Sequence, residues 1–170
     1  MMSLIMLSGL QGTGKSTLAQ ELASELQMPL FAKDYLEAIL YNDDLTDGAS
    51  IFSYHQILAL ADLHLSLGIS CILDAVFPLG GFRQQARYIV DKHHAIFIVI
   101  HTYCSDEALH RQRIETRQST VPWQRITWQD MCHTQSYYEA WSPDEALFLD
   151  AVNSLETNIQ KALQYIGDFS

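Results

Sequence analysis

Apolar and polar residues follow each other along the chain in two kinds of block. One kind repeats apolar residues every three or four positions, as an amphipathic helix does, and residues 14–27 with Leu18 and Leu22 are a clear case. The other kind is a short continuous apolar run, such as 4–7 or 95–100. The two kinds alternate, which is typical of βαβ units.

This pattern predicts where the strands and helices lie. The predicted strands span 4–8, 30–34, 69–77, 95–103 and 146–152. The predicted helices span 14–27, 35–40, 51–68, 83–94, 106–117 and 154–166. We expect Gly68 to end the third helix and Ser105 to cap the fifth. Parallel strands joined by helices are covered on both faces, so the pattern predicts an α/β fold around a mostly parallel sheet.

Residues 118–143 do not follow this alternation. They contain every tryptophan of the chain and an adjacent pair of tyrosines, and their periodicity is weak. We expect a partly helical lid or insertion here. With no linker or internal repeat elsewhere, the 170 residues are expected to form a single domain, 1–170.

Charge and composition exclude several classes of function. The net charge is −10, so a long polyanion such as a nucleic acid would be repelled, although a small anion in one local positive pocket would not. No apolar run approaches the roughly 20 residues of a membrane helix, and the N-terminus lacks the basic region of a signal peptide. We therefore expect a cytoplasmic protein without a membrane anchor. The 3 cysteines form no CxxC pair, which argues against a cysteine zinc site.

A glycine-rich loop follows the first predicted strand. "GLQGTGKS", residues 9–16, matches GxxxxGK[ST], with an amphipathic helix directly after it. Glycines let successive N–H groups turn toward an anion, and the helix adds its positive N-terminal end. In such a loop the lysine reaches the β- and γ-phosphates and the serine hydroxyl can ligate Mg²⁺. The predicted nucleotide-binding residues are Gly9, Gly12, Thr13, Gly14, Lys15, Ser16 and Thr17.

With this loop at its front, the chain resembles the small P-loop kinases of the AAA_33 type. These are relatives of chloramphenicol phosphotransferase, zeta toxin and polynucleotide 5′-kinase, and more distantly of adenylate and shikimate kinases. The resemblance implies a three-layer P-loop NTPase fold with strand order 2-3-1-4-5 and a lid. It also implies ATP and Mg²⁺ as cofactors. The choice of ATP over GTP rests on the resemblance alone. The sequence contains no NKxD-type guanine motif.

Asp34 lies at the end of the second predicted strand, where the family has a carboxylate that meets the acceptor hydroxyl. A carboxylate there can orient the hydroxyl and take its proton. Asp34 could instead simply cap the next helix. The polynucleotide kinase branch carries D-x-x-R at this point, whereas this chain has Glu37 in place of the arginine. An acid there would repel a phosphorylated acceptor, which favours a small and perhaps uncharged one.

Four further residues complete the predicted site. Asp74 ends the third predicted strand and resembles the Walker B acid, which implies a role at Mg²⁺ or beside the acceptor. Arg113 and Arg117 lie four residues apart on one helix, as the family's R-x-x-x-R pair does at the lid, or else form a solvated basic face. Arg83 could face the acceptor. Aromatic residues within 118–143 could line the acceptor pocket or belong to the core.

The sequence thus predicts a kinase that transfers the γ-phosphoryl group of ATP to a hydroxyl of a small molecule. Lys15, Asp34, Arg113 and Arg117 are the predicted catalytic residues, Ser16 and Asp74 the metal-binding ones, and Asp34, Asp74 and Arg83 the acceptor-binding ones. Two alternatives stay open, a nucleotide hydrolase without an acceptor and a regulatory module that binds nucleotide without turnover. The identity of the acceptor and the oligomeric state are left open.

Overall fold

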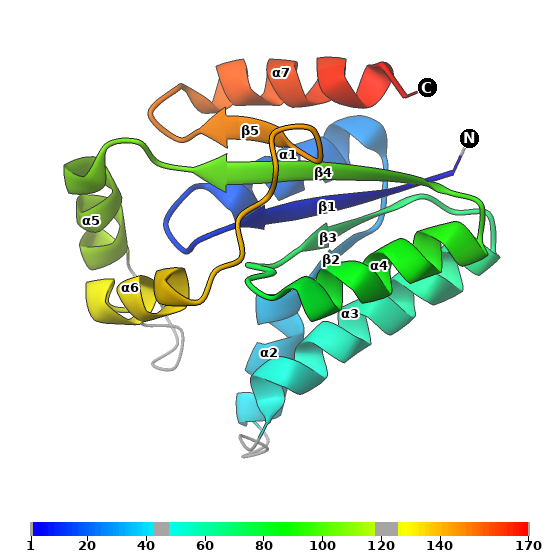
Figure 1. Ribbon diagram of the computed structural model, residues 1–170, viewed down its shortest axis with the longest axis horizontal. Coiled ribbons are helices and arrows are strands. Elements are labelled where there is room, and N and C mark those ends of the chain that lie inside the picture. The colour runs from blue at the N-terminus through cyan, green and yellow to red at the C-terminus, as the bar shows by residue number, and fades with distance from the viewer. Residues whose placement is uncertain (1, 43–47, 118–125, 170) are drawn as a thin grey trace.

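The computed structural model describes residues 2–42, 48–117 and 126–169, and its centre is a parallel sheet of five strands (Figure 1). The strands are β1 (Ser3–Gly9), β2 (Leu30–Ala32), β3 (Cys71–Asp74), β4 (Ile96–Tyr103) and β5 (Leu147–Asp150). Their order in the sheet is β2-β3-β1-β4-β5, and each neighbouring pair is parallel. The predicted parallel sheet and its 2-3-1-4-5 order are confirmed.

Helices cover both faces of the sheet. The described helices are α1 (Lys15–Leu26), α2 (Lys33–Asn42), α3 (Ala49–Ser66), α4 (Gly80–Lys92), α5 (Glu107–Thr116), α6 (Trp128–Ser136) and α7 (Leu155–Gly167). Apolar residues of α3 and α4 pack on one face, and those of α1 and α7 pack on the other. The remaining helices, α2, α5 and α6, lie toward the end of the sheet where the strands point (Figure 1). The predicted three-layer architecture is therefore confirmed.

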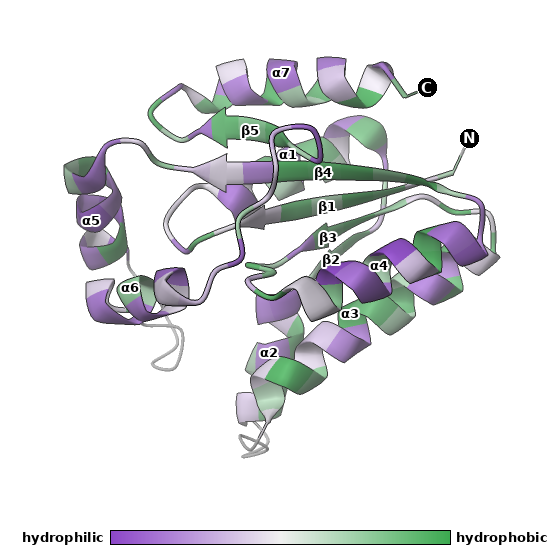
Figure 2. Ribbon diagram, viewed as in Figure 1, coloured by the Kyte–Doolittle hydropathy of each residue, from purple (hydrophilic) through white to green (hydrophobic). Residues whose placement is uncertain are grey.

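The central strand shows why this sheet forms. Every residue of β1 is buried, and its side chains alternate between the two faces. Leu4 and Met6 join the cluster with α3 and α4, whereas Ile5 and Leu7 join the cluster with α1 and α7. A strand covered on both faces needs a continuous apolar run, and Figure 2 shows the hydrophobic colour along the inner strands.

The residues that end or cap the helices agree only partly with those predicted from the sequence. α3 ends at Ser66, and Gly68 takes a left-handed conformation (φ +80°) just after the C-cap residue Leu67, as expected for a glycine at a helix end. Ser105 is not the cap of α5, because the carboxylate of Asp106 accepts the hydrogen bond from Leu109 N–H at 3.0 Å. The side chain of Ser105 is one residue too early to reach that orphan N–H group.

The third strand is shorter than its apolar run. β3 ends at Asp74, and Phe77 turns the chain with φ +49°, a conformation that a bulky residue rarely adopts. Two contacts hold this turn: Phe77 N–H donates to the Tyr54 hydroxyl at 3.1 Å, and Phe77 C=O accepts from Arg83 Nε at 2.9 Å. Tertiary contacts therefore override the strand propensity of this segment.

The predicted lid region contains α6 and a segment that packs against the sheet; residues 118–125 lie outside the described part. Trp141 Nε1 donates to Ser8 Oγ at 3.0 Å, and the Tyr138 hydroxyl lies 2.6 Å from the same oxygen. Trp141 is buried in the core cluster of α3 and α4. For these two aromatic residues the structure favours core packing over a role in the acceptor pocket.

Among the described residues, no helix is both long enough and apolar enough to cross a membrane. The described part also holds no group of three or more histidine, cysteine, aspartate or glutamate side chains that could form a metal centre by itself. The cysteines Cys71, Cys104 and Cys132 are free thiols.

Candidate nucleotide-binding site

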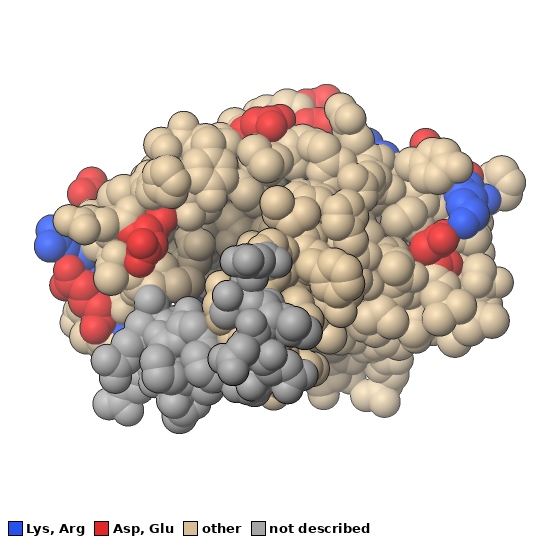
Figure 3. All heavy atoms as spheres, turned by 90° about the horizontal axis from the view of Figure 1, so that it is seen from below, with Lys and Arg blue, Asp and Glu red and all other residues tan. Residues whose placement is uncertain are grey.

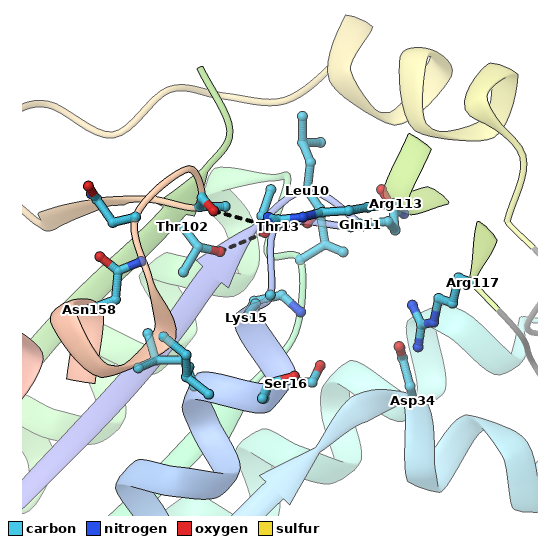
Figure 4. Close-up of a pocket in the computed structure, with 18 residues that line it drawn as sticks. Leu10, Gln11, Thr13, Lys15, Ser16, Asp34, Thr102, Arg113, Arg117 and Asn158 are labelled. Atoms are coloured by element: carbon cyan, nitrogen blue, oxygen red, sulfur yellow. Dashed lines mark hydrogen bonds between the residues drawn. The ribbon is translucent and has the colours of Figure 1, made fainter. Parts of the chain in front are cut away.

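The glycine-rich loop between β1 and α1 forms the floor of a cavity of about 410 Å³ at the end of the sheet (Figure 4). Gly12 and Gly14 have φ angles of +81° and +76°, which the loop needs in order to turn back on itself. The N-terminus of α1 faces the cavity, and residues from Leu10 to Leu18 line it. A loop of this shape in front of a helix N-terminus suits an anion.

The loop is held in shape by the neighbouring strand β4. Thr13 is buried, and its hydroxyl contacts the hydroxyl of Thr102 at 2.7 Å and donates to Leu10 C=O at 2.8 Å. Gly9 does not line the cavity. A Cβ atom at Gly9 would lie 2.3 Å from Thr102 C=O, so glycine is required there by the close approach of the two strands.

Lys15 points into the cavity and also meets Asp74 behind it. The Lys15 ammonium lies 3.0 Å from Asp74 Oδ1, and both side chains are buried. Burial alone would lower the pKa of Lys15, but the charges of Asp74 and Asp34 outweigh it, so the pKa is raised. Lys15 therefore carries a positive charge at neutral pH. The predicted position of Asp74 beside the glycine-rich loop is confirmed.

Asp34 lies at a different place in its helix than expected. β2 ends at Ala32, so Asp34 is the second residue of α2 and not the residue before it. Its side chain is 56% exposed and lines the cavity. The helix dipole favours its charge at this end, and the carboxylate is left accessible to a ligand.

Lys33 was not predicted to contribute to the site. Its side chain is buried, and its ammonium lies 2.6 Å from Glu37 and 4.0 Å from Asp34. The ammonium also lies 5.2 Å from the centre of the Tyr54 ring. Because Lys33 pairs with Glu37, the repulsion that we expected from Glu37 toward a charged acceptor is at least partly cancelled.

Arg113 and Arg117 both line the cavity, although they do not share a helix face. α5 ends at Thr116, and Arg117 has an extended backbone. Arg113 donates to Ala151 C=O at 3.0 Å, which fixes it beside the β5–α7 connection. In Figure 4 the side chains of Arg117 and Asp34 extend toward each other across the opening.

Arg83 does not fit the predicted contact with an acceptor. It is buried, it does not line the cavity, and its Nη2 donates to Glu139 C=O at 2.6 Å. Its guanidinium lies 4.0 Å from the Trp141 ring centre, and burial lowers its pKa. We therefore reassign Arg83 to holding the loop after β3 and the 138–141 segment against the sheet.

His110 is a second residue that the sequence did not reveal. It is buried under the glycine-rich loop, and its Nε2 lies 2.6 Å from Gln11 C=O. Single histidines have no local pattern that separates a structural contact from a surface position. Only the packing of α5 on the loop brings His110 to this place.

Comparisons with known proteins agree with this geometry. The family model of the AAA domain AAA_33 matches residues 4–135. A search among curated proteins finds no match.

Many solved structures share the fold. A sugar kinase from Janibacter sp. HTCC2649 superposes with a TM-score of 0.75 at 19% identity, covering 98% of this chain and 95% of that one. A gluconokinase from Sinorhizobium meliloti 1021 gives a TM-score of 0.73 at 14% identity, covering 98% and 93%. An APS kinase from Mycobacterium tuberculosis, solved with AMPPNP and APS, gives a TM-score of 0.71 at 19% identity, covering 98% of each chain. The family match spans most of the chain, and the chain therefore belongs to the AAA_33 family of P-loop proteins.

Proposed function

We propose that the protein is a kinase that transfers the γ-phosphoryl group of ATP to a hydroxyl group of a small molecule. The observation that carries the proposal is the lining of one cavity by three kinds of group. Lys15 and the glycine-rich loop can hold phosphates, Arg113 and Arg117 can meet the transferred group, and the accessible carboxylate of Asp34 can meet an acceptor. Nucleotide binding without transfer requires no exposed carboxylate opposite the phosphates.

Each residue has a role in the proposed transfer. The acceptor oxygen forms a bond to the γ-phosphorus as the bond from that phosphorus to the bridging oxygen breaks, and ADP leaves. The hydroxyl proton passes to the carboxylate of Asp34. Lys15, Arg113 and Arg117 stabilise the negative charge that spreads over the phosphoryl and bridging oxygens.

The residues present also fit a Mg²⁺ ion. Mg²⁺ prefers oxygen ligands and commonly takes one or two from the protein and the rest from phosphates and water. Ser16 lines the cavity, and Asp74 lies beside Lys15 with one oxygen engaged by that ammonium. Ser16 and Asp74 would hold the ion, and the ion would supply positive charge to the β- and γ-phosphate oxygens when bound.

A small acceptor suits the charge of the chain and of the site. The net charge of −10 disfavours a nucleic acid, and Asp34 and Glu37 together offset the Lys33 ammonium. Proteins of the same fold are described as a sugar kinase, a gluconokinase and an APS kinase, which supports a small-molecule acceptor. We place the protein in the cytoplasm, where ATP is abundant.

Asp34→Asn tests this proposal against both alternatives. The amide keeps the size of the side chain but cannot take a proton, so phosphoryl transfer should fall by about 10²–10⁴-fold. ATP affinity should change little, because Asp34 meets the acceptor and not the nucleotide. An acceptor is found first by incubating the protein with ATP and a metabolite pool and detecting the mass of one added phosphate. The Kd for ATP and the transfer rate are then measured for both forms.

Glu21→Gln is the matched control, because Glu21 is an exposed carboxylate on α1 that does not line the cavity. ATP hydrolysis at the same rate with and without any acceptor would favour the hydrolase. Saturable ATP binding with no turnover would favour the regulatory module. A large loss of ATP affinity in Asp34→Asn would place Asp34 at the nucleotide or its metal, and Asp74 would become the candidate base.

A further inference from the structure

His110, on α5, contacts the backbone of the glycine-rich loop at Gln11. Its Nε2 lies 2.6 Å from Gln11 C=O, and a carbonyl oxygen only accepts hydrogen bonds. Nε2 therefore carries a hydrogen, and His110 donates it to Gln11 C=O. The ring is buried and meets Trp128 of α6 edge to face, with the ring centres 5.5 Å apart.

This bond fixes the peptide between Gln11 and Gly12. In a planar trans peptide the C=O and the following N–H point in opposite directions. With Gln11 C=O directed at His110, the N–H of Gly12 is directed away from α5. Gln11 and Gly12 both line the cavity, so that N–H becomes available to an anion bound there.

The packing leaves this peptide little freedom to turn over. A Cβ atom at Gly12 would lie 2.7 Å from Ile114 Cγ1 and 3.2 Å from His110 Cδ2. The loop therefore rests directly on α5, the helix that also carries Arg113. A flip of the peptide would turn Gln11 C=O toward the phosphate position, where it would repel the phosphate oxygens.

We propose that His110 is a positioning residue that sets the Gly12 N–H to donate to a phosphate oxygen of the bound nucleotide. His110 itself touches no substrate in this arrangement. The inference rests on the proposed function only in its premise that the loop binds a nucleoside triphosphate. It adds that the His110 side chain, on α5, fixes the orientation of one N–H donor of the loop, that of Gly12.

Two substitutions separate the hydrogen bond from the packing. His110→Phe keeps an aromatic ring against Trp128 but cannot donate, whereas His110→Gln keeps an N–H group that can reach about as far as Nε2. Calorimetry gives the Kd of each full-length form for AMPPNP with Mg²⁺, and displacement gives the Kd for adenosine, which has no phosphates. Melting temperatures without ligand report on folding.

The expected result is that His110→Phe weakens AMPPNP binding about tenfold, as loss of one hydrogen bond to a charged group would. Adenosine affinity should change less than twofold, and His110→Gln should recover most of the AMPPNP affinity. A purely structural role would weaken both ligands together. Unchanged AMPPNP affinity in His110→Phe, parallel losses for both ligands, or no recovery by glutamine would overturn the inference. If the unaltered protein itself does not bind AMPPNP, the proposed function fails as well.

Discussion

Lys15 is in contact with two parts of the site at once. It reaches the cavity from the start of α1 and pairs with Asp74 at the end of β3. The raised pKa keeps its charge throughout the neutral range, although burial opposes that charge. Removing the ammonium would leave Asp74 buried without its partner, so the consequences for folding and for catalysis must be separated.

The prediction for Lys15→Ala is a loss of phosphoryl transfer of about 10²–10³-fold, the usual cost of removing one preorganised donor to a developing charge. Transfer is measured at saturating ATP, and the fraction of folded protein is measured in parallel by circular dichroism. Lys15→Arg is the control, because it keeps a positive charge beside Asp74 while changing the donor geometry. Near-normal transfer by folded Lys15→Ala would show that the glycine-rich loop is not the catalytic centre.

We expect His101 to make the free energy of unfolding depend on pH. Its side chain is half-buried on β4, its Nδ1 lies 3.2 Å from the Tyr138 hydroxyl, and burial together with the charge of Arg83 lowers its pKa to about 4. The unfolded chain binds this proton near pH 6.5, so the unfolded state holds more protons between the two pKa values. The contribution of His101 to the free energy of unfolding should therefore be fully present above pH 6.5. It should decrease as the pH falls toward 4, by at most about 3 kcal/mol.

Urea unfolding at several pH values tests this prediction, with His101→Phe as the comparison. The substitution removes the titrating group, so the difference in unfolding free energy between the two forms should change between pH 6.5 and 4. A constant difference over that range would mean that His101 is not responsible for acid lability.

Among the helices, α5 contacts the glycine-rich loop through His110 and also carries Arg113, with Arg117 directly after its end. Arg113 and Arg117 enter the same cavity from the end of this helix. Arg113→Ala and Arg117→Ala should each lower kcat more than they weaken ATP binding, because the charge that they meet is greatest in the transition state. Steady-state kinetics and ATP Kd values measured on the same preparations give the comparison.

Arg111→Ala is the matched control on the same helix. Arg111 is exposed, pairs with Glu115 at 2.7 Å and does not line the cavity, so its removal should leave kcat unchanged. If Arg113→Ala or Arg117→Ala raised KM with kcat intact, the arginine would stabilise the bound substrate and the transition state equally. Its proposed role in the transition state would then be wrong.

The sequence predicts elements better than it predicts their ends. The strand order was implied by the resemblance to the small P-loop kinases. Given that order, the place of Asp74 could be predicted, because an apolar strand that ends in an acid delivers it to the carboxyl edge of the sheet, beside the glycine-rich loop. The end of β3 could not, since the turn at Phe77 depends on Tyr54 and Arg83 from other elements. Arg83 was misassigned for the same reason: proximity along the chain to β3 does not show which way a side chain points.

At the scale of the molecule, the site collects positive charge in an acidic chain. Three cations, Lys15, Arg113 and Arg117, line one cavity of a protein with net charge −10. On the described part of the face in Figure 3, Lys and Arg side chains lie apart near the two ends and form no continuous basic surface. This distribution favours a small phosphorylated ligand in the cavity over a long polyanion on the surface.

The cavity also joins parts that are distant in sequence. Its walls come from the glycine-rich loop, the start of α2, the end of α5, the β5–α7 connection with Ala151 and Asn153, and α7 with Asn158. A ligand that contacts all of these parts stabilises them together. We therefore expect residues 1–170 to unfold as one domain in a single transition, and that whole transition to shift when nucleotide binds.

The prediction is a rise in melting temperature of roughly 5–10 °C with Mg²⁺ and AMPPNP at about 100 times Kd. A ligand that binds only the folded state adds about 2.7 kcal/mol at that concentration, and each kcal/mol corresponds to roughly 2–4 °C for a chain of this size. Scanning calorimetry gives the shift. Chelating Mg²⁺ with EDTA should reduce it, because the ion that Ser16 and Asp74 would hold would no longer supply positive charge to the phosphates. Lys15→Ala should reduce it further. A second transition that stays in place when ligand is added would show that part of the chain folds independently of the nucleotide site.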